Sequence, residues 1–284
     1  MTASAIAARA RGWQPYALFA VRVVAGLLFF QHGAEKMWGF AGARPEPTLF
    51  ALRGVGGILE SVGGPLLAVG LFTRPVAFLL SGEMAVAYFR SWAPRGFFPI
   101  ANGGEEATLF AFIFLWLWTA GSGAWSIDEW WRARRPRRPS RMTHWEPYTR
   151  SLLRIVVGFL LTLHGCRKLF GVLISVAGRR NAPPLALDGL PDVTGYLDLG
   201  AGVLLMLGLA TRPAALAVAV EALLAYAIIA APRTLWPIRN GGNEALLYVV
   251  VLGYLFLAGG GAWGLDAWRS SWRAGTGRSS DVNV

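Results

Sequence analysis

Cysteine and histidine are scarce in this chain, and each scarcity removes a class of function. The one cysteine, Cys166, can form neither an intrachain disulfide nor a Cys-x-x-Cys dithiol pair. A single thiol also excludes an iron–sulfur cluster held by this chain, and three histidines in 284 residues do not favour a haem or zinc site. We therefore expect no metal site and no cofactor bound through the chain's own thiols or metal ligands.

Charged side chains are also few, and their scarcity indicates a membrane protein. Only 15% of the residues are charged and 55% are hydrophobic, and the mean hydropathy is +0.45. Residues 107–127 and residues 245–265 form two stretches without a charged side chain. Each stretch has the length that a membrane-spanning helix needs, about 20 residues. The net charge of +11 comes from basic segments between the hydrophobic stretches, so the expected partner is the lipid bilayer and not nucleic acid.

The polar residues inside the hydrophobic stretches occur twice. Arg22, His32-Gly33 and Lys36 recur 132 positions later as Arg154, His164-Gly165 and Lys168. The second copy then has a longer loop, after which matched positions are 138 residues apart. The matched positions are then Glu60 with Asp198, Thr73-Arg74-Pro75 with Thr211-Arg212-Pro213, Glu83 with Glu221, and Asn102-Gly103-Gly104-x-Glu106 with Asn240-Gly241-Gly242-x-Glu244. A repeat of this order and spacing indicates a tandem duplication.

Each copy carries four hydrophobic stretches, which predicts an all-α membrane protein with two consecutive four-helix transmembrane bundles. In the first copy we expect helices near residues 16–38, 52–72, 75–92 and 106–121. Four spans are an even number, so the copies form a parallel internal repeat with about eight spans. The expected units are residues 1–131 and 151–272, with an Arg/Pro-rich linker at 132–150 and a polar tail at 273–284.

The linker sets the expected orientation, because it holds seven arginines within a short loop. Short loops rich in arginine stay in the cytoplasm. We therefore expect a protein of the bacterial inner (plasma) membrane with both termini cytoplasmic.

With that orientation, one set of polar residues shares the outer half of the membrane. Sequence fixes the depth of these residues and leaves the rotation of each helix open, so their convergence is a hypothesis. The first-copy candidates for a ligand-binding polar pocket are His32, Lys36, Glu60, Glu83, Arg90, Asn102 and Glu106, and the second-copy equivalents are His164, Lys168, Asp198, Glu221, Asn240 and Glu244. No residue is assigned a catalytic role.

Each candidate has a structural interpretation beside the functional one. For His32 and Lys36, four residues apart and hence on one helix face, an ion network and a ligand or proton site are both open. For Glu60 and Glu83 we favour the functional interpretation, because charged groups at membrane depth are usually paired or functional. Buried carboxyl groups can also exchange protons. The Asn102-Gly-Gly-x-Glu106 motif suits either a helix cap or a ligand contact.

The arginines near the other membrane face have simpler interpretations. For Arg22 and Arg154 we favour side chains that extend to the inner headgroups. Thr73-Arg74-Pro75 is expected to be a turn with no catalytic role.

At these positions the chain resembles the DoxX family of small four-helix membrane proteins. The resemblance rests on Arg22 with His32-Gly33-x-x-Lys36, on Glu60 before Gly70-Leu-x-Thr73-Arg74-Pro75, on Glu83 and on Asn102-Gly-Gly-x-Glu106, all of them repeated. It implies a four-helix bundle for each copy. It also implies a link to membrane redox chemistry, because relatives include DoxD, a subunit of a thiosulfate:quinone oxidoreductase.

Three functions follow as hypotheses, and the sequence does not decide whether the chain is an enzyme. The first is a redox-associated protein in which the polar pocket binds a quinone-like or small anionic substrate and a partner subunit supplies the electrons. The second is an assembly or binding module, or a small-molecule transporter, that uses the same buried charges. The third, a thiol oxidoreductase, needs a cysteine pair that Cys166 alone cannot supply. The two copies also differ in charge, since Glu35 becomes Arg167 in the second. The first copy keeps more ionic groups, because Arg90 becomes Ile228 and Glu105 becomes Asn243.

Overall fold

The computed structural model describes residues 3–46, 48–134, 141–171 and 191–276, and every ordered element in these ranges is helical. Eight of the described helices have 15 or more residues, four in each half. They are α1 (Ala3–Trp38), α2 (Leu52–Val69), α3 (Thr73–Ser91) and α5 (Glu105–Ala120) in the first half, and α7 (Glu146–Phe170), α8 (Pro191–Leu207), α9 (Thr211–Ala225) and α11 (Asn243–Ala258) in the second. The predicted all-α fold with a four-helix repeat is confirmed.

Shorter helices connect the long ones. Those in the first half and the linker are η1 (Phe40–Gly42), η2 (Ala93–Arg95), α4 (Pro99–Asn102), α6 (Ile127–Ala133) and η3 (Arg141–Trp145). Those in the second half are a π-helical turn, η4 (Tyr226–Ala230), then α10 (Pro237–Asn240) and α12 (Leu265–Thr276). Since α7 begins at Glu146, the last residues of the expected linker are helical. The longer second-half loop lies mostly outside the described residues.

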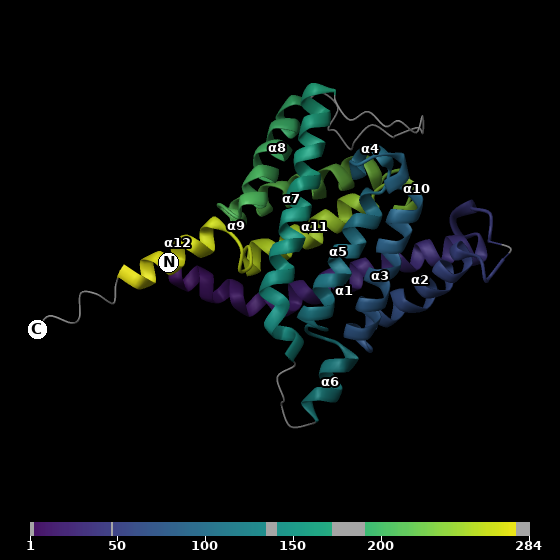
Figure 1. Ribbon diagram of the computed structural model, residues 1–284, viewed down its shortest axis with the longest axis horizontal. Coiled ribbons are helices and arrows are strands. Elements are labelled where there is room, and N and C mark those ends of the chain that lie inside the picture. Colours follow the sequence, from purple (N-terminus) through teal and green to yellow (C-terminus); the bar gives the residue numbers. More distant parts are fainter. Residues whose placement is uncertain (1–2, 47, 135–140, 172–190, 277–284) are drawn as a thin grey trace, which may run out of the picture.

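The two halves interlock and share one core. Within each half, the first helix packs on the second and the third packs on the fourth. Between the halves, α1 packs against α11 and α7 packs against α5. Figure 1 shows α1 and α2 extending to the right and α7 and α8 rising to the top, with α5 and α11 between them. One hydrophobic cluster therefore includes Phe29 and Phe114 of the first half together with Val157 and Val251 of the second.

Glycines bring α1 against α2, and α7 against α8, at backbone distance. A Cβ atom added to Gly33 would lie 2.4 Å from the backbone nitrogen of Ser61, and one added to Gly26 would lie 2.6 Å from the carbonyl oxygen of Gly64. The same approach recurs in the second half, where a Cβ on Gly165 would lie 2.5 Å from the backbone nitrogen of Leu199. Only glycine allows such contacts, and they hold the polar end of α1 close to Glu60 on α2.

Arg22 and Arg154 are buried, and the expectation that they extend to the headgroups was wrong. Arg22 is 0% exposed, and its guanidinium donates to the carbonyl oxygens of Leu67 at 2.8 Å, Ala68 at 2.6 Å and Trp125 at 3.1 Å. A helix leaves its last carbonyls without intrahelical partners, and Arg22 satisfies those at the end of α2. Arg154 repeats this arrangement at the end of α8, where it donates to Leu205 and Met206.

The neighbouring Thr-Arg-Pro turns are stabilised by residues that lie far away in the sequence. The Asp128 carboxylate accepts from the backbone N–H groups of Phe72 and Thr73 at 2.9 and 2.8 Å, and Asp266 does the same for Ala210 and Thr211. Arg74 donates to the carbonyl oxygens of Trp118 and Thr119, both at 2.8 Å. These contacts cap the start of α3 and the end of α5, so the motif is structural, as expected.

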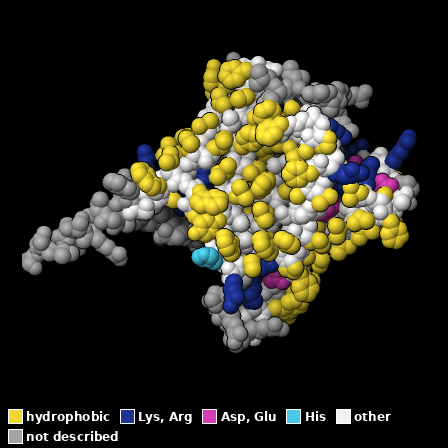
Figure 2. All heavy atoms as spheres, in the orientation of Figure 1, with side chains coloured by type: hydrophobic (Ala, Val, Ile, Leu, Met, Phe, Trp, Pro, Cys, Tyr) yellow, Lys and Arg dark blue, Asp and Glu magenta, His cyan; other side chains and the backbone are white. Residues whose placement is uncertain are grey.

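The outer surface of the long helices is apolar. Figure 2 shows hydrophobic side chains over most of one face, with lysine and arginine gathered toward its lower and right-hand ends. Exposed residues on successive helices include Val62, Val86, Phe89, Val220 and Leu223. Of the described helical stretches, Gly12–Trp38, Leu52–Val69 and Thr211–Ala230 are long and apolar enough to cross a membrane on their own. The surface matches that of a protein embedded in lipid.

Candidate functional site

Lys36 forms the centre of a buried cluster in the first half. Its ammonium group pairs with Oε1 of Glu60, and the Glu60 side chain is only 2% exposed. Glu83 approaches from α3: a Cβ added to Gly56 would lie 3.1 Å from Glu83 Oε1 and 3.9 Å from Lys36 Nζ. The three side chains therefore converge, and we call Lys36, Glu60 and Glu83 the first lysine triad.

The second half repeats this cluster, and there the lysine forms an ion pair with both carboxyl groups. Lys168 Nζ lies 2.6 Å from Asp198 Oδ2 and 3.1 Å from Glu221 Oε1. The two carboxyl groups also interact electrostatically with each other. Lys168, Asp198 and Glu221 lie together, and we call them the second lysine triad.

The two histidines pair across the halves. His32 Nε2 lies 2.8 Å from Glu106 Oε1 of its own half and 3.1 Å from Asn243 Nδ2 of the other half. Asn243 Nδ2 also donates to the same Glu106 oxygen at 2.8 Å. Glu106 and Asn243 stand at the N-terminal turns of α5 and α11, and the negative charge of Glu106 is favoured there by the helix dipole.

His164 pairs across the halves in the same way. Its Nε2 lies 2.6 Å from Oε1 of Glu105 in the first half, and that oxygen also accepts from the hydroxyl group of Tyr248 at 2.6 Å. Glu105 and Asn243 are equivalent positions in the two copies. Each histidine is thus bound by the fourth long helix of the opposite half.

Two residues that differ between the copies lie close together in the structure. Arg167, which replaces Glu35, lies 3.3 Å from Nδ1 of His164, and it interacts electrostatically with Glu105 and Glu244. The additional carboxylate of the first half, Glu105, therefore faces the additional cation of the second half. The two changes compensate each other's charge inside the interface.

Together these groups form a continuous band at one end of the molecule, which we call the polar band. Glu60 interacts electrostatically with His32 and Glu106, and Glu244 interacts with Glu105 and Glu106. The polar band comprises His32, Lys36, Glu60, Glu83, Glu105, Glu106, His164, Arg167, Lys168, Asp198, Glu221, Asn243, Glu244 and Tyr248. It runs from the first triad, through both histidines, to the second triad.

Three predicted candidates lie outside the polar band. Arg90 is exposed near the end of α3, and none of the ion pairs described in the structure includes it. Asn102 is buried and binds its own loop and α3: its Oδ1 accepts from the Gly104 N–H group at 2.7 Å, and its Nδ2 donates to the Gly96 carbonyl at 2.8 Å and to the Tyr88 hydroxyl at 3.2 Å. Asn240 makes the equivalent contacts with Gly242 and Thr234. Of the two interpretations of the Asn-Gly-Gly-x-Glu motif, the asparagines fit the structural one.

Sequence reasoning missed four members of the polar band. Glu105, Asn243 and Arg167 were noticed only as differences between the copies, and Tyr248 was not noticed. A signal existed, because Glu105 and Arg167 are compensating charge changes at the same expected depth. That signal can be used only when the packing of α5 against α7 is known.

Several buried polar atoms of the polar band have no hydrogen-bond partner. They are Glu60 Oε2, Glu83 Oε2, Glu221 Oε2, Asn243 Oδ1 and Arg167 Nε. Buried polar groups are normally paired, so these oxygens are available to a proton or to a hydrogen-bond donor. Among the described residues, no three His, Cys, Asp or Glu side chains are placed to hold a metal ion.

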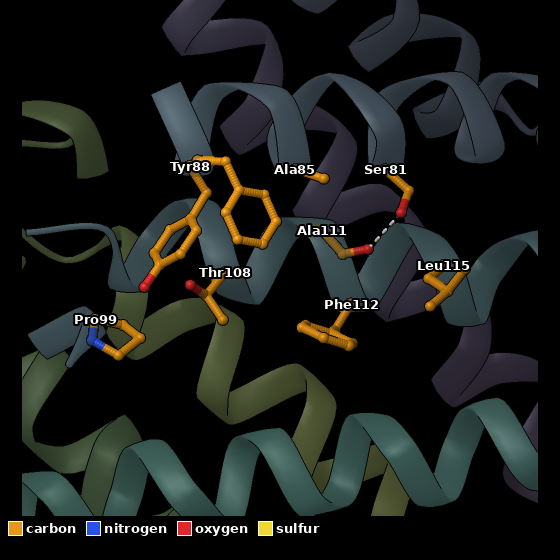
Figure 3. A pocket seen from close by; sticks show the side chains of 9 residues that line it. Ser81, Ala85, Tyr88, Pro99, Thr108, Ala111, Phe112 and Leu115 are labelled. Carbon is orange, nitrogen blue, oxygen red and sulfur yellow. Dashed lines mark hydrogen bonds between the residues drawn. The ribbon is translucent and has the colours of Figure 1, made fainter. Parts of the chain in front are cut away.

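A separate pocket of about 270 Å³ lies between α3 and α5. Its walls are mostly apolar, and Figure 3 shows Tyr88, Thr108 and Pro99 grouped at one end with Leu115 at the other. Ser81 and Tyr88 lie on the face of α3 opposite Glu83. The pocket therefore does not open onto the polar band.

Comparisons with known proteins fit the duplicated fold. A family model described as DoxX matches residues 17–91 and 150–231, which cover most of the first three long helices of each half. An uncharacterised protein of Haemophilus influenzae is 44% identical over 126 residues, which are 41% of this chain and 91% of the relative. An uncharacterised membrane protein of Mycobacterium tuberculosis is 29% identical over 135 residues, which are 40% of this chain and 80% of the relative. Each relative is thus about as long as one half, and no solved structure matches the chain.

Proposed function

The chain belongs to the DoxX family of membrane proteins, and from that membership we propose that it acts as a membrane-embedded subunit or partner of a quinone- or thiol/sulfur-linked oxidoreductase system. The observation that carries the proposal is the polar band, which is buried, spans both halves and keeps unpaired polar oxygens. Ionisable groups at membrane depth are costly and are usually retained for function.

The charges of the polar band favour proton handling over the capture of an anion. Lys36 and His32 are the cations that would attract an anionic substrate, yet Glu60 and Glu106 already neutralise them. The unpaired atoms Glu60 Oε2 and Glu83 Oε2 are acceptors. A redox partner that releases or consumes protons would find suitable groups here.

A quinone, which the family resemblance implies, fits the pocket between α3 and α5 better than it fits the polar band. The pocket walls are apolar, as the ring and tail of a quinone require. The Tyr88 hydroxyl lies 3.5 Å from its acceptor, the Phe97 carbonyl, which is a weak hydrogen bond. Tyr88 can therefore donate to a quinone oxygen, and a bound quinone would supply two-electron redox chemistry that the chain's own side chains lack.

The experiment is purification of the full chain in mild detergent, followed by optical spectroscopy, quinone extraction and identification of co-purifying subunits. We expect a bound quinone or a redox partner, and we expect Lys36→Ala to lower thiol or sulfur oxidation by membranes. Arg90→Ala, an exposed change outside the polar band, is the matched control and should leave that oxidation unchanged. Absence of any redox species, together with unchanged oxidation in Lys36→Ala membranes, would contradict the proposal.

A second candidate function is a non-catalytic assembly module or small-molecule transporter. The cross-half contacts of His32 with Asn243 and of His164 with Glu105 favour the assembly role, because they hold the two halves together. For an assembly module, Glu83→Gln should lower the yield and thermal stability of the protein and leave membrane oxidation rates unchanged. A loss of oxidation in a stable, well-expressed Glu83→Gln protein would exclude the assembly role.

For the location, we propose the bacterial inner membrane with both termini in the cytoplasm. The seven arginines of the linker support this orientation. A reporter enzyme fused after Val284 should be active only on the cytoplasmic side, and activity on the outer side would contradict the orientation.

A further inference from the structure

The two lysine triads are the most unusual feature of the polar band, because each places two carboxyl groups around one ammonium group. We propose that each triad stores one exchangeable proton between its two carboxyl groups, and that the first triad exchanges this proton more readily than the second. This inference deepens the proposed function by naming the proton as the ligand of the polar band, but it does not depend on a redox partner.

The first argument is the balance of charge. Lys36 neutralises one carboxylate, and its contact is with Glu60. Glu83 interacts with both groups but forms no ion pair of its own among the described residues. The other charged groups near Glu60 are His32 on α1 and Glu106 on α5, and these two pair with each other. A buried carboxyl group without a cation takes up a proton instead of staying charged.

The rest of the polar band does not change this balance. Between the triads stand three carboxylates, Glu105, Glu106 and Glu244, and three groups that can be cationic, His32, His164 and Arg167. This central set is neutral when both histidines are protonated. It has no surplus cation for either triad, so each triad needs one proton to become neutral.

The second argument is the crowding of carboxyl groups in the second triad. Lys168 Nζ lies 2.6 Å from Asp198 Oδ2 and 3.1 Å from Glu221 Oε1, so two carboxyl groups share one ammonium group. Two carboxyl groups that share one site repel each other when both are charged, which favours a proton on one of them. In addition, Glu60 Oε2 is buried without a partner on a residue that is 1% exposed, and the equivalent atoms Glu83 Oε2 and Glu221 Oε2 are also unpaired. These oxygens are the places where a proton can be held.

The difference between the triads is their access to the outside. The Lys36 side chain is 24% exposed, whereas the Lys168 side chain is 6% exposed. Lys168 also contacts both of its carboxyl groups directly, which the first triad does not do. The carboxyl groups Glu60 and Glu221 are only 2% and 10% exposed, so the route by which a proton from water reaches the first triad more easily runs along the Lys36 side chain.

The test is labelling of the full-length protein with dicyclohexylcarbodiimide, which reacts with protonated carboxyl groups in apolar surroundings and leaves a stable acylurea. Modified peptides are quantified by mass spectrometry over a range of pH. We expect modification of the first triad, at Glu83 or Glu60, to be several-fold faster than modification of Glu221. Above its titration midpoint the rate should fall about tenfold for each pH unit. Glu83→Gln should abolish labelling at position 83, with Glu221 as the internal control in the same molecule.

Three outcomes would overturn the proposal. The first is no labelling of either triad at any pH, and the second is a labelling rate that does not depend on pH. The third is protection by sodium ions at constant pH and ionic strength, which would assign the site to a cation in place of a proton. If Glu83→Gln does not fold, infrared difference spectra of the wild-type protein must still show a protonated carboxyl band that disappears at high pH. If the labelling is as expected while no redox species co-purifies and oxidation by Lys36→Ala membranes is unchanged, the proposed function is contradicted and the proton site stands.

Discussion

At the scale of single residues, the arginines inside the first helix of each half join parts of the chain that are far apart. Arg22 binds carbonyl groups at the end of α2 and in the segment after α5, and Arg154 does the same in the second half. A buried charge is stable only when its hydrogen bonds are satisfied, and the free carbonyls of helix ends provide acceptors. These arginines are therefore structural, and the polar band is the place to look for activity.

We predict that Arg22→Met lowers the free energy of unfolding by about 3 kcal/mol, because it removes several charge-assisted hydrogen bonds and leaves buried carbonyls unpaired. Chemical denaturation in detergent measures this change. The control is Arg90→Met, an exposed arginine, which should stay within about 0.5 kcal/mol of the wild-type protein. An Arg22→Met protein as stable as this control would show that Arg22 points to lipid after all.

The role of Arg22 could not be predicted from the sequence, although its repeat at Arg154 was visible. Its partners are backbone carbonyls, and backbone groups leave no residue-type signal in the sequence. The same holds for Asp128, which caps α3 across a gap of 55 residues. Depth alone also placed Asn102 with the histidines, while its side chain turns into its own loop.

At the scale of elements, helix pairs in close backbone contact position the charged side chains. The sequence predicted the long helices well, because their apolar runs and turn residues are strong signals: α2 begins at the expected Leu52, and α3 begins at Thr73, two residues before the expected start. The short helices α6 and α12 and the π-helical turn η4 were not predicted. Such short elements depend on tertiary packing more than on local sequence.

We predict that Gly33→Ala lowers the free energy of unfolding by about 1–3 kcal/mol, because its Cβ would overlap the backbone of α2. The added atom would also push Lys36 away from Glu60. The matched control is Gly82→Ala on α3, where a Cβ meets nothing within 4 Å, and this change should be neutral or stabilising by up to about 1 kcal/mol. Thermal unfolding of the two variants side by side measures the difference, and equal stability would contradict the close packing of α1 on α2.

At the scale of the whole molecule, the duplicated halves form one structure in place of two adjacent bundles. The sequence showed the duplication and the depth of each polar residue. It could not show that α7 packs on α5 and α1 on α11, because the hydrophobic pattern of a helix does not identify its neighbour. The cross-half pairing follows from that packing.

The central claim is that each histidine is bound by the opposite half, and a double-mutant cycle on His164 and Glu105 tests it most directly. The free energies of unfolding of His164→Ala, Glu105→Ala, the double variant and the wild-type protein are measured in the same detergent. Because these side chains are 2.6 Å apart, we expect a coupling energy of about 1 kcal/mol or more. A coupling energy of zero, as two independently folded bundles would produce, would contradict the account.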